Sequence, residues 1–514
     1  MTFQSAREFV PVRRSDSVPF CLSSPARMRA ATAPKGLARQ LLADSTINAL
    51  RRKTPELSAA APLARWQRVA PLGVIALTSA LVVAKPEAAS DAIAVTLAAP
   101  FLLVVTLRAL ALLGIVAPRK RAVVRHRLAS IHDSRSLPTY SVLVALYREA
   151  AAAPGLVRGL ARFDYPRDKL EIVFLLEEDD AETRAALSAA IRLPYMRIVT
   201  VPAGFPKTKP RALTYGLQGV SGELIAVYDA EDIPERAQLR KAAAAFAAAG
   251  DDVACVQAKL GLYNAGESWL SRQFTIEYAA LFEAILPLLE RLRLPFPLSG
   301  TSNHFRRDRL VEAGAWDPFN LTEDADLGLR FARRGYRVEM IESTTWEEAP
   351  ATWKVWLGQR TRWIKGWLQT YLVHMRHPAR LWRELGGWGF FGVQLTFGAM
   401  ALSALAHPWM YVALIAEVAR GGAIEAGRSA IWMIAYVVLI SGYVTGVALP
   451  AASAARRRGG WLILSAIWQP IYWLAISLAA YRAVLDLILR PYYWEKTPHR
   501  GAHVRPRRRK KKRS

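Results

Sequence analysis

Cysteine is scarce in this sequence. Its 514 residues include two cysteines, Cys21 and Cys255, and neither has a partner at the short spacing of a zinc site. A disulfide framework is therefore excluded as the means by which the chain holds its fold. An apolar run near Met1 is also lacking, so we expect no cleavable signal peptide. No Gly-x-Ser-x-Gly motif is present, which leaves no sign of a serine nucleophile.

Acidic residues are the minority charge. The chain has 42 Asp and Glu against 69 Lys and Arg, a formal net charge of +27. Part of this excess lies in two basic runs, residues 51–53 and 505–513, which flank apolar parts of the chain. Anionic lipid headgroups are the simplest partner for such runs. Because no basic motif is interleaved with aromatic residues, we expect no nucleic acid partner.

Apolar runs, by contrast, are abundant: hydrophobic residues make up 52% of the chain and the mean hydropathy is +0.12. Residues 92–117 exceed the ~20 residues that a membrane-spanning helix needs, and residues 69–84 approach that length. With a short loop between them, they predict a transmembrane hairpin, and a pair of buried core helices is the alternative. The basic residues 119–121 favour the hairpin, because such residues collect on the cytoplasmic side.

Three further apolar stretches, residues 388–418, 431–451 and 461–480, predict a second transmembrane block. The first of them is either one long span or a hairpin broken near His407-Pro408, so the number of crossings stays open. The expected order of segments is a disordered basic cytoplasmic arm (1–65), a transmembrane hairpin (66–117), a cytoplasmic globular domain with interfacial helices (118–387), a transmembrane block (388–490) and a basic tail (491–514).

Between the two apolar blocks, strand-length apolar runs alternate with segments of helical pattern. The expected strands cover residues 140–146, 170–176, 196–201, 224–228 and 253–260, and the expected helices cover residues 150–163, 181–191, 211–217 and 237–249. This alternation predicts an α/β domain with a largely parallel sheet. Such sheets bind ligands beyond the carboxyl ends of their strands, so polar motifs should follow the strands.

Three polar motifs occur in order along this region. The first is Asp229-Ala230-Glu231-Asp232, which follows an apolar strand and places two carboxylates at positions i and i+2. Such a pair can share a divalent cation that also holds a diphosphate, although an isolated acidic cluster is more often a solvated turn. The second motif is Thr322-Glu323-Asp324, and the third is Gln359-x-x-Arg362-Trp363.

The order and spacing of these motifs resemble the membrane-bound family 2 glycosyltransferases, the class of cellulose, chitin and hyaluronan synthases. The resemblance covers roughly residues 138–369 and the flanking apolar pattern. It implies a GT-A-like (Rossmann-like) α/β catalytic domain embedded between transmembrane α-helical segments. It also implies a hexosyltransferase that depends on Mg²⁺ or Mn²⁺.

The resemblance assigns roles to the first two motifs. Asp229 and Glu231 are the expected metal ligands, with Asp229 also in the donor site. Glu231 stands where the family has a second Asp, and Asp232 can share its role as a ligand. Asp324 is the expected general base, with Glu323 beside it as a second catalytic residue. A helix N-cap is the structural alternative for the Thr-Glu-Asp segment.

In the third motif, the resemblance implies that Gln359 and Trp363 bind the acceptor and that Arg362 binds the diphosphate, as guanidinium does bidentately. The alternative is an interfacial amphipathic helix, given the spacing of its tryptophans. The remaining donor-site residues are expected after the first strands and in a basic turn. They are Tyr147, Glu149, Glu177 or Asp179, and Lys209. The usual Pro and Asn of the family's first motif are absent.

The expected function is that of an integral-membrane inverting glycosyltransferase. It would transfer glucose or N-acetylglucosamine from a UDP-sugar to a growing β-linked polysaccharide or oligosaccharide. The alternatives are a non-processive transferase that acts on a lipid carrier, and a membrane receptor or secretion scaffold with a decayed transferase domain. The expected partners are the UDP-sugar, a saccharide acceptor, membrane lipids and secretion subunits. The expected location is the inner (plasma) membrane, multi-pass, with the catalytic domain in the cytoplasm.

Overall fold

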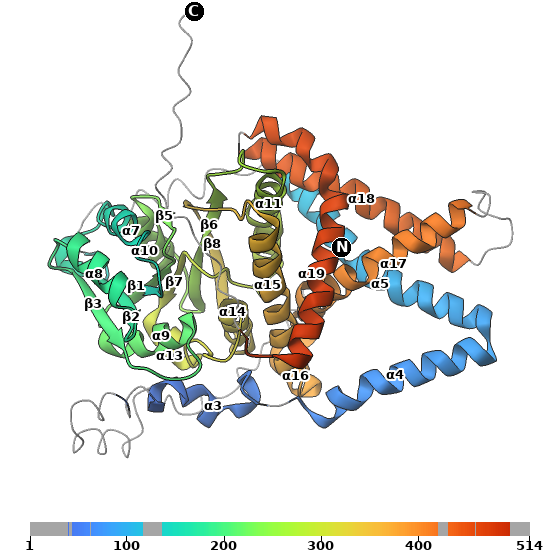
Figure 1. Cartoon of the computed structure of the whole chain (residues 1–514), viewed down its shortest axis with the longest axis horizontal. Coiled ribbons are helices and arrows are strands. Elements are labelled where there is room, and N and C mark those ends of the chain that lie inside the picture. The colour runs from blue at the N-terminus through green and yellow to red at the C-terminus, as the bar shows by residue number, and fades with distance from the viewer. Residues whose placement is uncertain are drawn as a thin grey trace, which may run out of the picture.

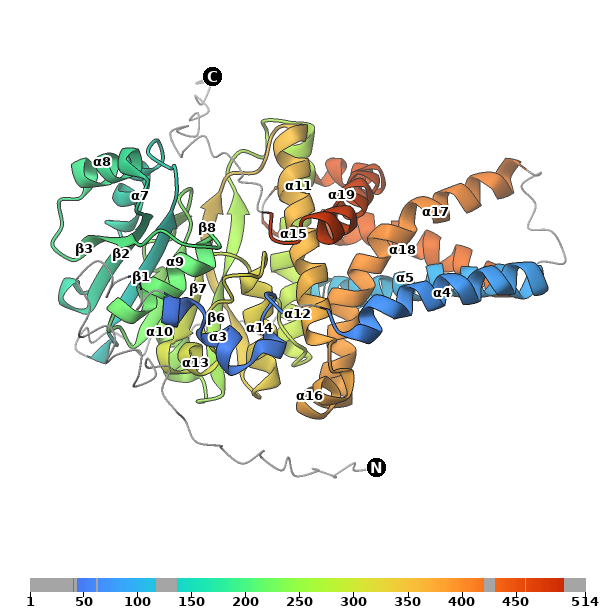
Figure 2. The ribbon, with the colours of Figure 1, turned by 60° about the horizontal axis from the view of Figure 1, so that its bottom comes forward.

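The computed structural model describes residues 40, 44–61, 63–116, 136–419, 430–457 and 459–493. It consists of a sheet domain and, beside it, a block of long helices (Figure 1). Helices α11 and α15 stand between the two parts (Figures 1 and 2). A cavity at this boundary is lined both by strand ends and by the long helices.

The sheet domain is built on eight strands. They are β1 (Tyr140–Leu146), β2 (Leu170–Glu177), β3 (Met196–Val201), β4 (Leu224–Tyr228), β5 (Ile233–Pro234), β6 (Val253–Leu262), β7 (Asn303–Arg306) and β8 (Arg337–Glu347). Their order in the sheet is β3-β2-β1-β4-β7-β6-β8-β5. Strands β3, β2, β1 and β4 run parallel, β7 is antiparallel to both its neighbours, and β8 is parallel to β6 but antiparallel to β5.

Buried residues on both faces of the sheet explain why strands β1, β2 and β4 are largely apolar. In β1, Leu143 packs into the core on one face, whereas Val142 and Val144 pack into the core on the other. This alternation follows from the two-residue repeat of a strand. The helices that cover the two faces are α7 (Ala153–Leu160), α8 (Ala181–Ala190), α9 (Lys209–Gly216), α10 (Gln238–Ala248), α12 (Leu286–Arg291), α13 (Arg307–Glu312) and α14 (Glu323–Arg333).

The predicted α/β, Rossmann-like fold is therefore confirmed, and the five predicted strands are β1 to β4 and β6. Strands β5, β7 and β8 were not predicted. They make one half of the sheet mixed rather than parallel. The short turns of the domain are η3 (Arg167–Lys169), η4 (Leu217–Gly219) and the π-turn η5 (Leu281–Ile285), which joins α11 (Trp269–Ala280) to α12.

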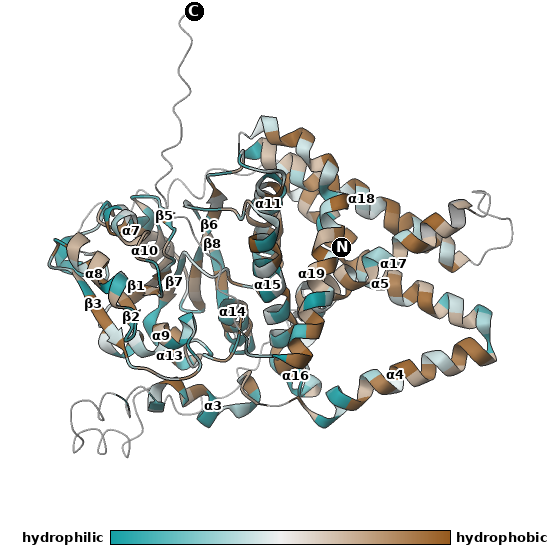
Figure 3. Ribbon diagram, viewed as in Figure 1, coloured by the Kyte–Doolittle hydropathy of each residue, from teal (hydrophilic) through white to brown (hydrophobic). Residues whose placement is uncertain are grey.

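The long helices form the second part. They are α4 (Arg65–Ala84), α5 (Pro86–Val116), α16 (Pro378–Val393), α17 (Met400–Ala419), α18 (Ala430–Arg456) and α19 (Gln469–Leu489), with η6 (Gln394–Ala399) before α17 and η7 (Gly460–Trp468) before α19. Within the described residues, five stretches are long and apolar enough to cross a membrane. Figure 3 shows hydrophobic residues recurring along α4, α5, α17 and α18.

The stretch between residues 388 and 418 is not a hairpin. Helix α17 continues through Pro408, and α16, η6 and α17 follow one another without a loop. The helical backbone is interrupted just before this stretch, at Gly386 of α16, whose φ is 66°. The stretch from Pro378 to Ala413 therefore counts as a single candidate span. Proline is tolerated here because neighbouring groups can satisfy the carbonyl that it frees.

Part of the expected disordered arm is ordered. Helix α3 (Ala49–Lys53) and the turn η1 (Pro55–Leu57) lie on the sheet domain, with Leu50 and Leu57 buried (Figure 2). Arg376 donates hydrogen bonds to the backbone carbonyls of Glu56, Ser58 and Ala61. Residues 44–61 thus differ from the prediction because tertiary contacts satisfy their backbone, which composition does not reveal. The rest of the arm up to residue 43, apart from residue 40, lies outside the described residues, as does the basic tail from residue 494.

Asp317 fastens this segment to the domain. Its carboxylate accepts a hydrogen bond from the Ala59 amide at 2.6 Å and another from the Ser58 hydroxyl at 3.2 Å. We expect Asp317→Ala to release the segment, because an unsatisfied buried amide costs about 1–3 kcal/mol. Trypsin should then cleave at Arg51, Arg52 and Lys53 roughly fivefold faster or more than in the wild type. The matched control is Asp308→Ala on α13, an exposed acid, which should leave the cleavage rate unchanged.

Candidate active site

A cavity of about 530 Å³ lies where the sheet domain meets the long helices. It collects nearly all the residues that the sequence singled out. Its lining includes Tyr147, Glu149, Glu177, Lys209, Asp229, Glu231, Glu323, Asp324, Gln359, Arg362 and Trp363. Two of the residues named from the sequence, Asp179 and Asp232, do not belong to this lining. The cavity begins at the edge where β1, β2 and β4 end, as expected for a parallel sheet.

A cluster of carboxylates occupies the strand ends. Burial and the neighbouring charge of Asp229 raise the pKa of Glu231 to about 8. Asp232 accepts a hydrogen bond from the Asp229 amide at 2.7 Å and another from the Thr301 hydroxyl, and burial raises its pKa well above the ordinary range. Glu347, at the end of β8, joins this cluster, and its pKa is also raised by burial and by Asp232.

Sequence reasoning missed Glu347. The antiparallel pairing of Ile233 with Trp346 brings the end of β8 beside the Asp229 motif, although more than a hundred residues of chain separate them. The sequence gives little signal for Glu347, because β8 (Arg337–Glu347) mixes polar, charged and apolar residues, unlike the apolar β4 that leads into Asp229.

The cluster suits a divalent cation in its charge and in its unsatisfied atoms. Oδ1 of Asp232 and Oε1 of Glu347 are buried and have no hydrogen-bond partner among the described residues. Crowded carboxylates repel one another, and a cation would relieve that repulsion. The described residues contain no group of three His, Cys, Asp or Glu side chains arranged to hold a metal by themselves.

Lys209 lies between the two acidic motifs. Its ammonium pairs with Asp229 and donates a hydrogen bond to the Gly300 carbonyl at 2.6 Å. Burial alone lowers the pKa of an amine, but the charges of Asp229 and Glu323 outweigh it and raise the pKa of Lys209 well above its usual value. Lys209 therefore stays charged and contributes a fixed positive centre to an otherwise acidic wall.

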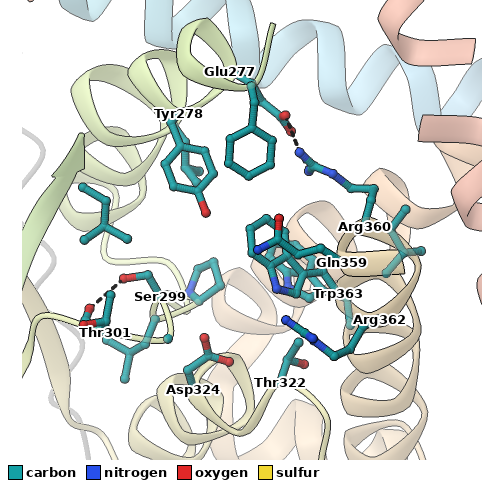
Figure 4. Close-up of a pocket in the computed structure, with 18 of the residues that line it drawn as sticks. Glu277, Tyr278, Ser299, Thr301, Thr322, Asp324, Gln359, Arg360, Arg362 and Trp363 are labelled. Atoms are coloured by element: carbon teal, nitrogen blue, oxygen red, sulfur yellow. Dashed lines mark hydrogen bonds and ion pairs between the residues drawn. The ribbon is translucent and has the colours of Figure 1, made fainter. Parts of the chain in front are cut away.

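Asp324 and Glu323 begin helix α14. Asp324 points into the cavity opposite Arg362 (Figure 4) and accepts a hydrogen bond from the Ala325 amide at 2.8 Å. Burial raises the pKa of Asp324 to about 6, and burial together with Asp324 raises the pKa of Glu323 to about 8. The helix starts at Glu323, so Asp324 is a first-turn residue rather than the N-cap.

The neighbouring acid of the same turn has a different environment. Asp326 is fully buried, where its carboxylate binds Arg330 at 2.8 Å and His374 at 2.9 Å. Arginine holds its pKa below the ordinary value despite burial. Asp326 therefore ties α14 to helix α15 (Trp353–His374) and does not face the cavity, whereas Asp324 does.

Helix α15 supplies the opposite wall. Gln359, Arg362 and Trp363 point into the space above Asp324 (Figure 4). The Tyr278 ring lies 6.3 Å from the Trp363 ring at an interplanar angle of 27°, and Phe274 stacks on Tyr278 at 4.7 Å. These aromatic faces form a wall of the kind on which a sugar ring can pack. Sequence reasoning missed Phe274 and Tyr278, because α11 carries no motif.

Helix α15 only partly matches the predicted interfacial helix. Its tryptophans do not share one exposed face, since Trp353 is 45% exposed and Trp356 is fully buried. The Trp356 indole donates a hydrogen bond to the hydroxyl of Tyr472, on α19, at 2.9 Å. α15 therefore packs between the sheet domain and α19, which leaves its motif residues aimed at the cavity.

The other end of the cavity holds the candidate donor residues. Tyr147 and Glu149 follow β1, and Glu177 ends β2. Of the two alternatives for the base-binding position, Glu177 lines the cavity but its carboxylate is paired with buried Arg211 at 3.2 Å. Asp179 is half exposed outside the lining and pairs with Lys207 at 2.7 Å. Lys207 also lies 4.9 Å from the centre of the Tyr147 ring.

Comparison with known proteins gives a consistent result. Residues 138–366 match the family described as "Glycosyltransferase like family 2". The probable glycosyltransferase YdaM of Bacillus subtilis is 28% identical over 241 residues, which cover 46% of this chain and 56% of that protein. The beta-monoglucosyldiacylglycerol synthase of Synechocystis sp. is 26% identical over 46% of this chain and 50% of its own length.

Two further comparisons show lower identity. Glucomannan 4-beta-mannosyltransferase 1 of Oryza sativa is 23% identical over 53% of each chain. The structure of the mannosyltransferase PcManGT from Pyrobaculum calidifontis, in complex with GDP-Man and Mn²⁺, is 20% identical with a TM-score of 0.49, over 78% of this chain and 99% of that one. The chain spans about half the length of the curated relatives it matches.

The matched residues include the whole Asp229 motif, the Thr322-Glu323-Asp324 turn and the Gln359-x-x-Arg362-Trp363 segment, all of which the fold brings to one cavity. The family predicted from these motifs is thereby confirmed. Residues 138–366 of this chain are similar to the family 2 glycosyltransferases over most of the predicted catalytic region.

Proposed function

We propose that this protein is an integral-membrane inverting glycosyltransferase. It transfers a hexose unit, glucose or N-acetylglucosamine, from a UDP-sugar to a saccharide hydroxyl and forms a β-linkage. One observation carries the proposal: Asp324, Arg362 and the acidic strand end at Asp229 line a single cavity at the boundary with helices long enough to cross a membrane. The relatives named above, a glucosyl lipid synthase and a mannosyltransferase of glucomannan, support hexose transfer.

The donor occupies the sheet end of the cavity. Tyr147 offers its ring to the base, and Glu149 and Glu177 stand beyond the strands where the ribose and base are held. Asp179 and Lys207 lie at the rim. Asp229 and Glu231 would hold Mg²⁺ or Mn²⁺, which neutralises the charge of the departing nucleoside diphosphate. Lys209 and Arg362 bring fixed positive charge to the same diphosphate from opposite walls.

The acceptor lies on the α15 side. Trp363 and Tyr278 provide ring faces for a sugar, and Gln359 has a buried side-chain oxygen without a partner among the described residues, suited to an acceptor hydroxyl. The acceptor oxygen forms a bond to the anomeric carbon while the bond from that carbon to the diphosphate breaks. The acceptor proton passes to the carboxylate of Asp324, and UDP leaves with the electron pair. Attack opposite the leaving group inverts the α-linked donor to a β-linked product.

The decayed-scaffold alternative predicts loss of these groups. Instead, the base candidate, the acidic strand end and the cationic residues are all present and line one cavity. The Glu at position 231 keeps a carboxyl group in the cluster, and a bound cation would favour its ionised form. Catalysis is the function that the arrangement favours.

Asp229→Asn tests the cation site. The substitution removes one charged ligand, so turnover should fall by about 10²-fold or more. Folding should be retained, because removal of one charge relieves repulsion within the carboxylate cluster. The measurement is UDP release against Mn²⁺ concentration, with Asp251→Asn, an exposed acid, as the control. Equal rates for Asp229→Asn and the wild type, with and without chelator, would refute the metal assignment.

Asp324→Asn tests the base. The amide cannot take a proton, and a positioned base is worth about 10²–10⁴-fold, so transfer should nearly vanish while UDP binding persists. The wild-type rate should fall as the pH drops through about 6, because the carboxyl then becomes protonated. Asp326→Asn should instead lower the melting temperature, since it breaks a buried ionic network. Loss of UDP affinity in Asp324→Asn, with transfer retained, would move the base elsewhere.

The proposed orientation places the sheet domain in the cytoplasm, where nucleotide sugars are made, at the inner (plasma) membrane. Two engineered cysteines test it in a chain with Cys21 replaced, and Cys255 needs no change because it is fully buried. Ser188→Cys on α8 should react with a membrane-impermeant thiol probe only after permeabilisation. Ala88→Cys, at the α4–α5 turn, should react in intact cells. The opposite pattern would invert the topology.

A further inference from the structure

The cavity does not end at the catalytic residues. It continues between α5, α17, α18 and α19, where apolar side chains such as Val104, Met400, Leu449 and Ile476 line it. This inner part is therefore built from helices that are candidate membrane spans. A ligand that reaches from Asp324 into this space has to combine a polar end with an apolar one.

Three polar side chains of the inner part have hydrogen-bonding atoms without a partner among the described residues, although Nε2 of His407 lies 3.4 Å from the Tyr443 hydroxyl. Arg108, on α5, has no hydrogen-bonding or ion-pairing group within reach among the described residues, and its guanidinium lies over the Trp473 ring at 4.5 Å. Oγ of Ser403 and Nδ1 of His407 are buried and also without a hydrogen-bond partner in the described part of the chain. His407 is only 2% exposed.

These groups gather at one place. Ser403 and His407 are four residues apart on α17 and so share a helix face. The His407 and Trp473 rings lie 5.6 Å apart, on the same indole that Arg108 covers. Gly446 makes this arrangement possible, because a Cβ at that position would collide with the Trp473 ring. Three helices thus converge on a small polar site inside an apolar block.

The positive charge of Arg108 is not paired with a carboxylate of the described residues. Glu277 attracts Arg108 electrostatically. Its carboxylate, however, is bound by Arg360 at 2.9 Å and 2.6 Å and by the Tyr472 hydroxyl at 2.9 Å. An ionisable residue within a membrane helix is costly, and when it lacks a counter-charge it indicates a site for a ligand. The missing partner of Arg108 is an anion.

The position of Arg108 along α5 agrees with a lipid headgroup. It lies eight residues before the end of the helix at Val116, or about 12 Å along the axis. The helix has 31 residues, about 46 Å, so it exceeds the ~30 Å hydrocarbon core and its end extends toward the headgroups. Arg108 is thus placed within reach of a lipid phosphate on the side of the sheet domain.

We propose that Arg108, Ser403 and His407 bind the phosphate of a lipid that carries the saccharide acceptor. This inference rests on the proposed function and names the class of its acceptor. The guanidinium, hydroxyl and imidazole N–H donate hydrogen bonds to the phosphate oxygens. The apolar chain lies between α5, α17, α18 and α19, and the saccharide extends past Tyr278 and Trp363 to present its terminal hydroxyl to Asp324.

The test uses the full-length protein in phosphatidylcholine nanodiscs with radiolabelled UDP-glucose and UDP-N-acetylglucosamine. The acceptors are a glycosyl-phosphoprenol, a glycosyl-diacylglycerol with the same sugar, and the free oligosaccharide with inorganic phosphate. We expect label in the chloroform-soluble product with the phosphate-bearing lipid. Arg108→Gln should raise the KM for that lipid roughly 10- to 100-fold and leave kcat and UDP binding close to wild type. Arg68→Gln, an exposed arginine of α4 outside the cavity, should change neither.

Ser403→Ala gives a second readout that does not depend on transfer. It removes a buried hydroxyl without a hydrogen-bond partner among the described residues, so the melting temperature of the lipid-free protein should hold or rise. The increase in melting temperature on adding the glycosyl-phosphoprenol should shrink in Ser403→Ala and in Arg108→Gln, but persist in Arg68→Gln.

Several outcomes overturn the inference. Equal use of the neutral lipid, equal use of free oligosaccharide, or a lipid-induced stabilisation unchanged in Arg108→Gln each excludes a phosphate site. Transfer to a neutral lipid or to a soluble polymer refutes this inference alone and leaves the proposed function intact. Absence of transfer from either UDP-sugar to any acceptor refutes the proposed function, while the stabilisation measurement still decides whether the phosphate site exists.

Discussion

The ion pair between Arg360 and Glu277 fixes helix α15, and the rest of the site depends on that helix. Arg360 binds both carboxylate oxygens of Glu277, on α11, and also donates to the hydroxyl of Tyr472, on α19. A bidentate pair of this kind restricts both position and rotation. With Arg360 held on one side of α15, Gln359, Arg362 and Trp363 have to face the cavity. The same contacts join the sheet domain to the long helices.

The cavity is electrostatically divided along its length. Its sheet end gathers carboxylates whose mutual repulsion and burial raise the pKa of Glu231, Asp232 and Glu347, with Lys209 as the main counter-charge. Its helical end carries Arg108, Arg360 and Arg362, and Glu277 is the carboxylate that Arg360 binds there. A metal-bound diphosphate suits the first end and an anionic lipid suits the second. Asp324 lies where the two ends meet.

Local patterns in the sequence are sufficient to predict much of the fold and several residues of the site. The apolar runs of β1, β2 and β4 are followed by polar residues. A buried parallel strand can be predicted from such a run alone, without knowledge of distant parts of the chain. The same holds for the long apolar helices and for the three motifs, each of which lies within one turn or one helix. The sequence by itself therefore identifies Asp324, Arg362 and Trp363 as candidate site residues.

Only the tertiary structure decided the rest, because the relevant contacts join residues far apart in the chain. The pairing of β5 with β8 adds Glu347 to the acidic cluster, and the contact of Asp317 with Ala59 orders a segment whose composition suggests disorder. Glu177 rather than Asp179 lines the cavity because its side chain turns inward beside Arg211. A sequence shows that Arg108 sits in an apolar helix. Whether a counter-charge lies next to it depends on how four helices pack, and packing is a property of the folded chain alone.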